Sequence, residues 1–300
     1  MNLPNRPSLF SSRAGLLFAF ALTAREVAAE SKVTYSHDID AKWGYVGGAH
    51  IHERGIAAAS IYEQNNSIRY TLTSQVSPRT LLRFGAEWDR FSFGVLNSSP
   101  VPNTLQQISA IFGMDWQFSD RWLFRGEIHP GVYSDFQNVG WNDVDAPALL
   151  SAAYLANADL QWFFGLRIDP RSRYPVIPAV GVRWKFADEW TLKAILPEPR
   201  LEYEFNDRFS AYIGGSFHAG TFRMSETFGD IRGRPPLNRA MLDYFEVRVG
   251  PGFSWRIRPE IEVGASAGCM IYRRFDFSAQ HVAVSSDPAP YVQIACQFRF

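Results

Sequence analysis

The sequence predicts an all-β fold: a transmembrane antiparallel up-and-down β-barrel of about 14 strands, with about 12 as the fallback, preceded by a cleavable signal peptide. Three observations predict this fold class. They are an export signal at the N-terminus, a strand–turn–strand unit that recurs with aromatic residues around its turn, and a final amphipathic strand that ends in phenylalanine. Residues 1–29 are therefore expected to be the signal peptide and residues 30–300 the barrel.

The export signal has its three parts in the usual order. Arg6 and Arg13 form the positive region, residues 14–24 are apolar, and small residues end at Ala29, where cleavage is expected. The apolar run has about half of the ~20 residues that a spanning helix needs. A buried N-terminal helix is the alternative. The signal predicts export through the general secretory route, and together with the strands described next it predicts the outer membrane of a Gram-negative bacterium.

The composition suits a barrel wall and excludes some partners. Lys+Arg and Asp+Glu number 30 each, so the formal net charge is zero. This argues against nucleic acid as a partner, because nucleic-acid binders need a net basic face. Aromatic residues make up 15% of the chain, yet the mean hydropathy is slightly negative, as expected where only alternate residues face lipid. Cys269 and Cys296 are expected as small apolar residues on the lipid face, with a cross-strand disulfide as the alternative.

The recurring unit appears as MDWQFSDRW at 114–122 and VRWKFADEW at 182–190, with weaker copies at 201–209 and 253–261. Each copy alternates large apolar with polar residues, breaks at turn-forming residues and restarts on a large apolar residue, aromatic in three of the four. Alternation has the period of a β-strand, so each copy predicts a hairpin. Aromatic residues that crowd the turns are typical of the girdle at a membrane–water boundary. A plain aromatic core is the alternative.

These hairpins and the other alternating segments give the expected strands. They lie near residues 32–44, 56–76, 80–93, 105–118, 121–135, 146–156, 160–168, 177–186, 190–197, 200–206, 208–223, 241–255, 260–275 and 289–300. Longer polar connections at 98–103, 138–146, 225–238 and 278–287 alternate with the short turns. Short periplasmic turns and long extracellular loops are the asymmetry of such barrels, so the N-terminus is expected on the periplasmic side.

The chain ends in YVQIACQFRF, residues 291–300. Val292, Ile294, Cys296, Phe298 and Phe300 alternate with polar or small residues, so one face of this strand is apolar. Pairing it with the first strand would close the sheet and leave no open edge. A last strand that ends in Phe300 resembles the signal read by the barrel-assembly machinery, which is one expected partner; outer-membrane lipid is the other. An ordinary edge strand is the alternative.

Charged residues share one face of the expected strands. Because charge on the lipid face costs about 2–4 kcal/mol at mid-bilayer, these side chains are expected to point into the lumen and to pair there. The candidate lumen-facing residues are Arg83, Glu87, Asp89, Arg125, Glu127, Arg183, Lys185, Glu202, Glu204, Glu246 and Arg248. Whether they fill the barrel or line a narrow path is left open.

Several stretches resemble a known family. They are HPGVYSDF at 129–136, RYPVIPAVGVRW at 173–184 and WTLKAILPEPRLEY at 190–203. With the turn at 206–207 and the last strand, they are similar to an uncharacterised family of bacterial outer-membrane β-barrel proteins, a domain of unknown function. The resemblance implies the barrel and its location, and carries no activity, ligand or catalytic residue. The polar segment 47–54 departs from the pattern and puts the first strands in doubt.

A search for catalytic or metal chemistry finds weak candidates. His129, His218, Ser134 and Asp135 are the residue types of a barrel hydrolase, but no spacing ties them together. His50 and His52 are half of a metal site and are expected in a solvated loop. Asp143 and Asp145 lack the further oxygens that calcium requires. We therefore expect no enzyme, no metal and no cofactor.

Three functional hypotheses remain. The preferred one is a passive pore for small solutes, because about 14 strands leave internal space. The second is a non-conducting structural or binding barrel with a plugged lumen. The third is a hydrolase at the rim of the barrel, acting on lipid or peptide.

Overall fold

The computed structural model describes residues 35–53, 55–95 and 99–300. The expected signal peptide, residues 1–29, lies outside the described residues. The strands are β1 (Tyr35–Glu53), β2 (Ile56–Ser77), β3 (Thr80–Val95), β4 (Thr104–Gln117), β5 (Trp122–Ile128), β6 (Gly131–Ser134), β7 (Val144–Asp145), β8 (Ala148–Leu155), β9 (Leu160–Ile168), β10 (Val176–Lys185), β11 (Trp190–Ala194), β12 (Arg200–Asn206), β13 (Phe209–Arg223), β14 (Met241–Arg258), β15 (Ile261–Phe277), β16 (Val282–Ser286) and β17 (Ala289–Arg299). Short helices are η1 (Trp141–Asp143), α1 (Phe228–Ile231), η2 (Pro235–Leu237) and η3 (Ser278–Gln280). Over this described part of the chain, no helix combines the length and apolar character needed to cross a bilayer.

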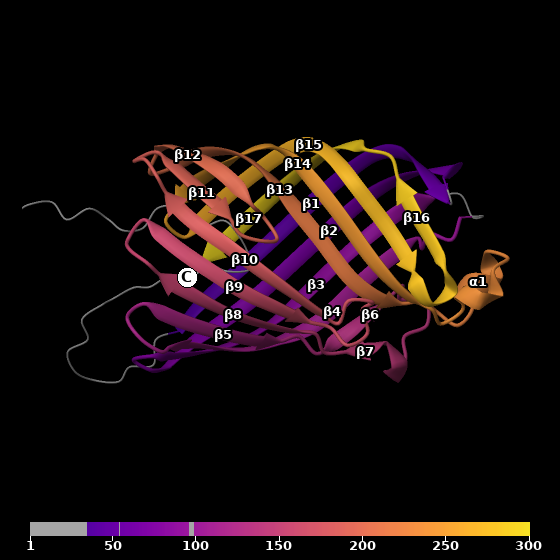
Figure 1. Cartoon of the computed structure of the whole chain (residues 1–300), viewed down its shortest axis with the longest axis horizontal. Helices are drawn as coiled ribbons and strands as arrows, with labels where there is room; N and C mark the ends of the chain where they lie inside the picture. The colour runs from indigo at the N-terminus through magenta and orange to yellow at the C-terminus, as the bar shows by residue number, and fades with distance from the viewer. Residues whose placement is uncertain (1–34, 54, 96–98) are drawn as a thin grey trace, which may run out of the picture.

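The strands form one closed antiparallel barrel (Figure 1). β5 continues into β6 and β16 continues into β17, while β7 is a two-residue strand within a loop, so the wall has 14 strands. The first and last strands pair from Asp38 with Arg299 to Val46 with Tyr291. The predicted fold class and strand number are confirmed. We call the end with the short hairpin turns and the C-terminus the turn end, and the opposite end the loop end.

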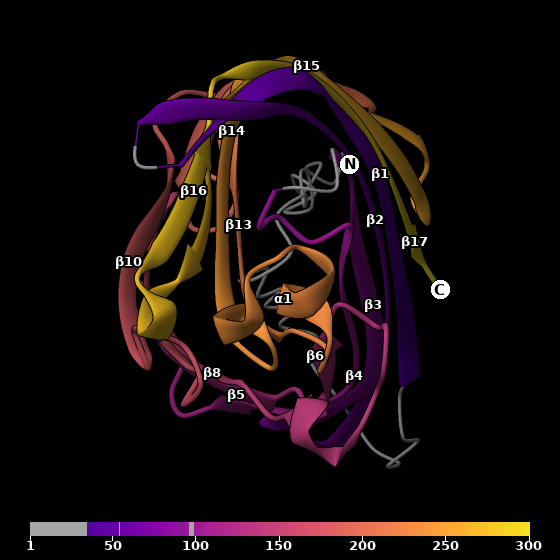
Figure 2. The ribbon, with the colours of Figure 1, turned by 90° about the vertical axis from the view of Figure 1, so that its right-hand side faces the viewer.

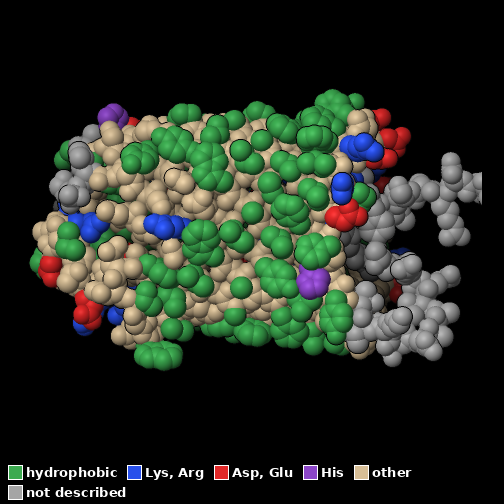
Figure 3. All heavy atoms as spheres, turned by 180° about the vertical axis from the view of Figure 1, so that it is seen from behind, with side chains coloured by type: hydrophobic (Ala, Val, Ile, Leu, Met, Phe, Trp, Pro, Cys, Tyr) green, Lys and Arg blue, Asp and Glu red, His purple; other side chains and the backbone are tan. Residues whose placement is uncertain are grey.

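The outer face of the wall is apolar. Figure 3 shows hydrophobic side chains along the flank of the barrel, with most charged side chains at the two ends. At the turn end, aromatic rings form chains of ring contacts that run from hairpin to hairpin. One chain joins Trp184, Phe186, Trp190, Tyr203, Phe205, Phe209 and Phe253, with ring centroids 4.9–6.5 Å apart. These rings come from the repeated sequence unit and form the girdle that it predicts.

The last strand follows the predicted alternation. Val292, Ile294 and Phe298 are exposed on the outside of β17, while Tyr291 is buried inside. Cys269 and Cys296 are both free and alternate with the inward residues of β15 and β17, on the lipid side. They lie six residues apart in the β15–β17 register, Val263 facing Cys296 and Cys269 facing Pro290, so the alternative of a cross-strand disulfide is wrong.

Two predictions near the loop end are wrong. β1 continues to Glu53, so residues 47–53, with His50 and His52, belong to a strand and not to a solvated loop. The alternation of the sequence does not reveal this part of β1, because two glycines between Val46 and Ala49 form a bulge that shifts the register and inverts the alternation. The segment 278–287, expected as a loop, contains β16, which extends the last wall strand toward the loop end.

At the loop end, a direct contact between β13 and β6 narrows the mouth of the barrel. Arg223 at the end of β13 pairs in parallel with Ser134 of β6, and the backbone N–H of Asp135 donates to the carbonyl of Arg223. β13 thus reaches β6 directly, past the ends of the strands that separate them in the sheet order. This contact brings the connection from β13 to β14 over the mouth.

Candidate functional site

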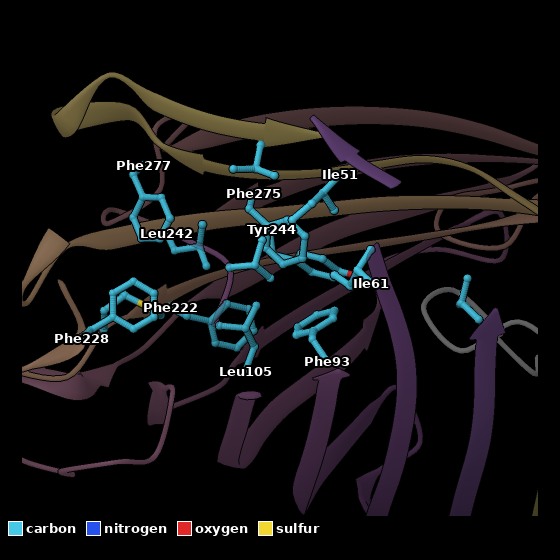
Figure 4. Packing of buried hydrophobic residues seen from close by; sticks show 14 of the residues in the cluster. Ile51, Ile61, Phe93, Leu105, Phe222, Phe228, Leu242, Tyr244, Phe275 and Phe277 are labelled. Carbon is cyan, nitrogen blue, oxygen red and sulfur yellow. The ribbon is translucent and has the colours of Figure 1, made fainter. Parts of the chain in front are cut away.

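The interior of the barrel at the loop end is filled by apolar side chains (Figure 4). Phe93, Tyr244 and Phe275 pack at its centre, with ring centroids 5.1–5.7 Å apart. The cluster draws on most strands around the mouth, and its buried members include Val46, Ile51, Ile61, Phe93, Leu105, Tyr133, Phe222, Leu242, Tyr244, Met270, Phe275, Phe277, Val284 and Tyr291. A barrel lumen that carries water is lined by polar groups, so this layer is a seal.

The connection 224–240, which we call the plug segment, completes the seal. Figure 2 shows α1 inside the ring of strands when the barrel is viewed from the loop end. Phe228 and Leu237 are buried and belong to the same apolar cluster. Phe228 lies against Phe277, with ring centroids 5.9 Å apart. The plug segment is therefore held by the hydrophobic effect against the mouth it covers.

Polar contacts tie the plug segment to the rim. Arg234 binds the carboxylate of Glu53 with both guanidinium nitrogens, at 2.6 and 2.7 Å, and this bonding raises the pKa of Arg234. Arg232 donates to the carbonyl of Ser99 and to the side chain of Asn103. A bidentate pair fixes geometry as well as energy. These contacts join the plug segment to β1 and to the connection between β3 and β4.

Beneath the seal lies a cluster of buried charges. Glu246 accepts from Nε of Arg248 at 2.5 Å and from Nε of Arg273 at 2.8 Å. Glu63 on β2 accepts from the same two arginines, at 2.7 and 2.5 Å. The hydroxyl of Tyr244 donates to Glu246 at 2.8 Å and lies 3.1 Å from Glu63. All four charged side chains are wholly buried, and two positive and two negative charges balance, as burial requires.

A second cluster lines β2 to β5. Glu127 accepts a hydrogen bond from Arg69 at 3.0 Å and forms an ion pair with Arg83 at the same distance, and Arg125 binds Asp115 at 2.6 and 2.7 Å. Glu87 pairs with Arg69 at 3.2 Å, and Gln107 donates to Glu87 and to Asp89. Opposite charges on neighbouring strands thus satisfy one another within the lumen.

A third group lies on the opposite wall, at the short hairpin of β11 and β12. Glu202 accepts a hydrogen bond from Lys193 at 2.6 Å and forms an ion pair with Arg200 at 3.2 Å. Glu198, in the turn between β11 and β12, pairs with Lys42 of β1 across the lumen. Beside this pair is a cavity of about 70 Å³, with Tyr212 and Gln293 among its lining residues. The cavity is too small for a solute larger than two or three waters.

The sequence-predicted residues are distributed over these groups. Glu246 and Arg248 meet in the first cluster, and Arg83, Glu87, Asp89, Arg125 and Glu127 in the second. Glu202 is in the third, but its partners are Lys193 and Arg200 and not Arg183, which lies opposite Lys193 in the β10–β11 register. Lys185 shares the face of Arg183, and Glu204 shares that of Glu202. Sequence reasoning missed Lys42, Glu63, Arg69, Asp115, Lys193, Glu198, Arg200 and Arg273, of which most also sit at inward positions of alternating strands.

The structure does not bring the candidate catalytic residues together. His129 lies 3.4 Å from Glu127, and the His218 ring meets Phe91 edge-on at 6.0 Å. Ser134 and Asp135 accept backbone N–H bonds in the loop that follows β6. Within residues 35–53, 55–95 and 99–300, no hydrogen bond links His129 or His218 to a hydroxyl or thiol that would act as nucleophile.

The candidate metal ligands have other partners. His52 pairs with Asp287 at 2.9 Å, and His50 lies 3.4 Å from the hydroxyl of Ser60. Asp143 accepts from the backbone N–H of Gly140, and the pKa of Asp145 is raised by burial. Among the described residues, no group of three or more His, Cys, Asp or Glu side chains is placed to hold a metal ion.

Comparisons with known proteins give one family and a set of similar solved structures. Residues 73–298 match a family described as a domain of unknown function, DUF6268. No curated protein matches the chain. Solved structures with a similar fold include an outer membrane channel from Pseudomonas putida F1, with 9% identity, 92% of this chain and 100% of that chain covered, and a TM-score of 0.46. The Ralstonia pickettii toluene transporter TbuX has 10% identity, 88% and 90% coverage and a TM-score of 0.41. The NanC porin has 12% identity, 87% and 98% coverage and a TM-score of 0.36. Likeness at these identities concerns the fold alone.

Proposed function

Because this chain belongs to the family DUF6268, a domain of unknown function, we propose its role from its own lumen: an outer-membrane channel that is closed at rest and opens when the plug segment leaves the mouth. The observation that carries this proposal is the burial of Phe228 and Leu237 of the plug segment in the apolar cluster of the lumen. In this proposal the loop end faces the outside of the cell, and the insertion machinery reads β17.

The width of the barrel wall suits an open channel, whereas the side chains that fill the lumen suit a closed one. A wall of 14 strands is wide enough to leave a path once its lumen is cleared. At rest the lumen is crossed by an apolar layer and by wholly buried ion pairs. A hydrated ion does not cross an apolar layer without losing its water, which costs far more than thermal energy. A passive pore, open at all times, therefore has less support than a gated one.

The plug segment is the part of the filling that can move as a unit. It is one connection between β13 and β14, so its departure breaks no ladder of the wall. Two of its polar ties, Arg234 to Glu53 and Arg232 to Ser99 and Asn103, lie at the rim where water can replace them. A third, from the N–H of Ser225 to Asp135, is buried at the start of the segment and acts as its hinge in this proposal. The buried ion pairs deeper in the barrel and the apolar side chains of the wall strands stay with the wall, so the path that opens when the plug segment leaves runs beside them.

The test is conductance of the purified chain in planar lipid bilayers. We expect the wild type to be silent for most of the recording. Removal of residues 226–238, with a short Gly-Ser link in their place, is expected to give stepwise conductance, and Glu53→Gln to give brief openings. Glu226→Gln, which breaks the exposed pair with Arg239, is the matched control and is expected to behave as the wild type.

Each other hypothesis predicts a different record. Steady large steps from the wild type would establish a passive pore and contradict the gate. A silent wild type together with a silent, correctly inserted deletion variant would leave the non-conducting structural barrel. A hydrolase would require loss of an assayable lipid or peptide hydrolysis in a His129→Ala, His218→Ala double variant.

A further inference from the structure

The barrel wall is interrupted above the hairpin of β11 and β12. β11 pairs with only four residues of β10, from Val182 to Lys185. β12 pairs with β13 only up to Gly214, and the turn between β11 and β12 adds two bonds, from the N–H groups of Gly215 and Phe217 to carbonyls of the turn. From there toward the loop end, residues 176–180 of β10 and 218–222 of β13 have no wall strand between them (Figure 1). We call this interval the seam; at about 3.3 Å per residue it is about 16 Å long.

Backbone polar groups face the seam from both sides. The N–H of Lys185 donates toward β9, to Asp159, and the carbonyl of Pro175 accepts from Asp169 on the same side. Odd-numbered residues of β10 therefore bond to β9, and even-numbered ones turn their N–H and C=O toward the seam. On β13 the N–H groups of Gly215 and Phe217 point toward β12, so those of residues 219 and 221 point into the seam.

An open strand edge in hydrocarbon is costly, since each unsatisfied backbone group there costs several kcal/mol. The middle even-numbered position of β10 is Pro178, which has no N–H to leave unpaired. Proline on an edge also blocks the addition of another strand. This argues against a second copy of the chain as the partner of the edge. Water or the polar part of a ligand must reach the groups that remain, which include those of Val180 and Ala219 and the carbonyl of Pro178.

The side chains beside these groups are apolar. Val180, Ile177 and Leu196 are 64%, 38% and 42% exposed, on or next to the edge of the seam. On the β13 side the small side chain of Ala219 is exposed, while the ring of Phe222 occupies the space beside Gly220. A molecule in the seam therefore meets apolar side chains along its body and backbone donors and acceptors at the two strand edges, which is the surface that an amphipathic molecule needs.

Both ends of the seam are fastened. Toward the loop end, Ser172 and Arg173 of the β9–β10 connection bind Asp243 on the outer side of β14, and Arg173 also binds Asp276. Toward the turn end, the hairpin turn is held by Glu198, whose partner is Lys42 across the lumen. The seam is thus a bounded slot. On its inner side lies His218, whose buried Nε2 has no hydrogen-bond partner among the described residues.

We propose that the seam is a lateral portal, through which a small amphipathic molecule with an apolar body and one hydrogen-bonding head passes between the lumen and the bilayer. This rests on the proposed function in one respect only: the lumen is the compartment from which the molecule comes. The axial gate is the plug segment and the lateral portal is the seam, so an experiment can refute one proposal without refuting the other.

The first measurement tests whether the seam is open. All variants carry Cys269→Ser and Cys296→Ser, and a nitroxide label is attached to a single cysteine at Ala219→Cys in the reconstituted chain. The control is Phe245→Cys, which faces lipid in the uninterrupted wall opposite Ala219 in the β13–β14 register. We expect the label at residue 219 to collide with a water-soluble nickel chelate about tenfold more often than the label at residue 245, at matched depth.

The second measurement tests passage. Gram-negative cells that carry the chain take up N-phenyl-1-naphthylamine, an apolar probe with one N–H, and its fluorescence gives the initial rate. We expect Ala219→Trp, which fills the seam, to lower the rate conferred by the chain about tenfold. Phe245→Trp is the control and is expected to leave that rate unchanged.

Three results would overturn the portal. One is a label at residue 219 that collides with oxygen but not with the nickel chelate, which would mean that the wall is sealed against water there. Another is protection from oxygen and nickel together, which means that a second copy covers the edge. The last is uptake by Ala219→Trp at the wild-type rate in a correctly inserted barrel. If the deletion of residues 226–238 conducts while Ala219→Trp takes up the probe normally, the gate stands and the portal is wrong; the converse pair of results leaves the portal and removes the gate.

Discussion

Replacing Glu246 by glutamine removes one of the two negative charges of the buried cluster beneath the seal. The carboxylate of Glu246 accepts from Arg248 at 2.5 Å, from Arg273 at 2.8 Å and from Tyr244 at 2.8 Å. Its side chain and those of both arginines are wholly buried. The amide keeps the size of the side chain and leaves a net positive charge in the cluster, far from water.

Breaking a buried pair by removing one partner costs about 3–5 kcal/mol, because the remaining charge is uncompensated. We therefore expect Glu246→Gln to lower the free energy of unfolding by about 3–5 kcal/mol. The double variant Glu246→Gln, Arg273→Met restores the charge balance and is expected to recover part of that loss. The assay is urea unfolding of the chain in lipid vesicles, followed by the gel mobility of the folded barrel.

The matched control is Glu226→Gln at the exposed pair with Arg239, whose side chains are 62% and 59% exposed. An exposed pair contributes about 0–1 kcal/mol. If Glu246→Gln loses no more stability than Glu226→Gln, water reaches the cluster and the lumen is not sealed as described.

Further predictions concern the lipid face, the plug segment and the packing of the wall. Ile213, 62% exposed on the outside of β13, is expected to tolerate leucine, while Ile213→Arg should lower stability by about 2–4 kcal/mol in the same unfolding assay; equal stability of the two variants would contradict lipid contact. Phe228→Ala is expected to weaken the seating of the plug segment by about 3–5 kcal/mol, seen as more frequent openings in bilayer recordings, and an unchanged opening frequency would count against that seating. A Cβ on Gly85 would lie 2.1 Å from the carbonyl oxygen of Tyr70, so Gly85→Ala should destabilise the barrel by about 1–3 kcal/mol, whereas Gly140→Ala, with open space around it, should not; the reasoning fails if the two variants unfold alike.

Alternation along the sequence determines which face a residue takes, and this is why the wall could be predicted. The strands near the C-terminus show it: in β17 every second residue is apolar and faces outward. The same rule fails where the strand contains a bulge, because one extra residue inverts the pattern. Gly47 and Gly48 do this in β1, and the polar residues after them then look like a loop.

The face of a residue does not determine its partner across the lumen. Arg183 and Glu202 are both among the predicted lumen-facing residues, but Glu202 is bound by Lys193 and Arg200, which the register of the short hairpin brings beside it. Lys42 and Glu198 meet from opposite walls. Their separation of 156 residues along the chain leaves no local signal.

No periodic pattern in the sequence predicts that the plug segment is buried in the mouth. Phe228 and Leu237 are isolated apolar residues in a stretch rich in Arg, Pro and Gly, which is the composition of an exposed loop. Only the narrowing of the mouth, where β13 meets β6, places this stretch over an apolar cluster. Tertiary contacts of this kind decide whether a barrel is open.

The sealed lumen is tested most directly by the reactivity of one cysteine placed inside it. Ala289 is buried in the apolar cluster at the start of β17, and Ala289→Cys with Cys269→Ser and Cys296→Ser changes its volume little. A small membrane-impermeant methanethiosulfonate reagent is expected to label it in vesicles about 100-fold more slowly than Arg239→Cys on the outside of the plug segment. Equal labelling rates would contradict the account, because they would mean that water already occupies the space that the apolar cluster is described as filling.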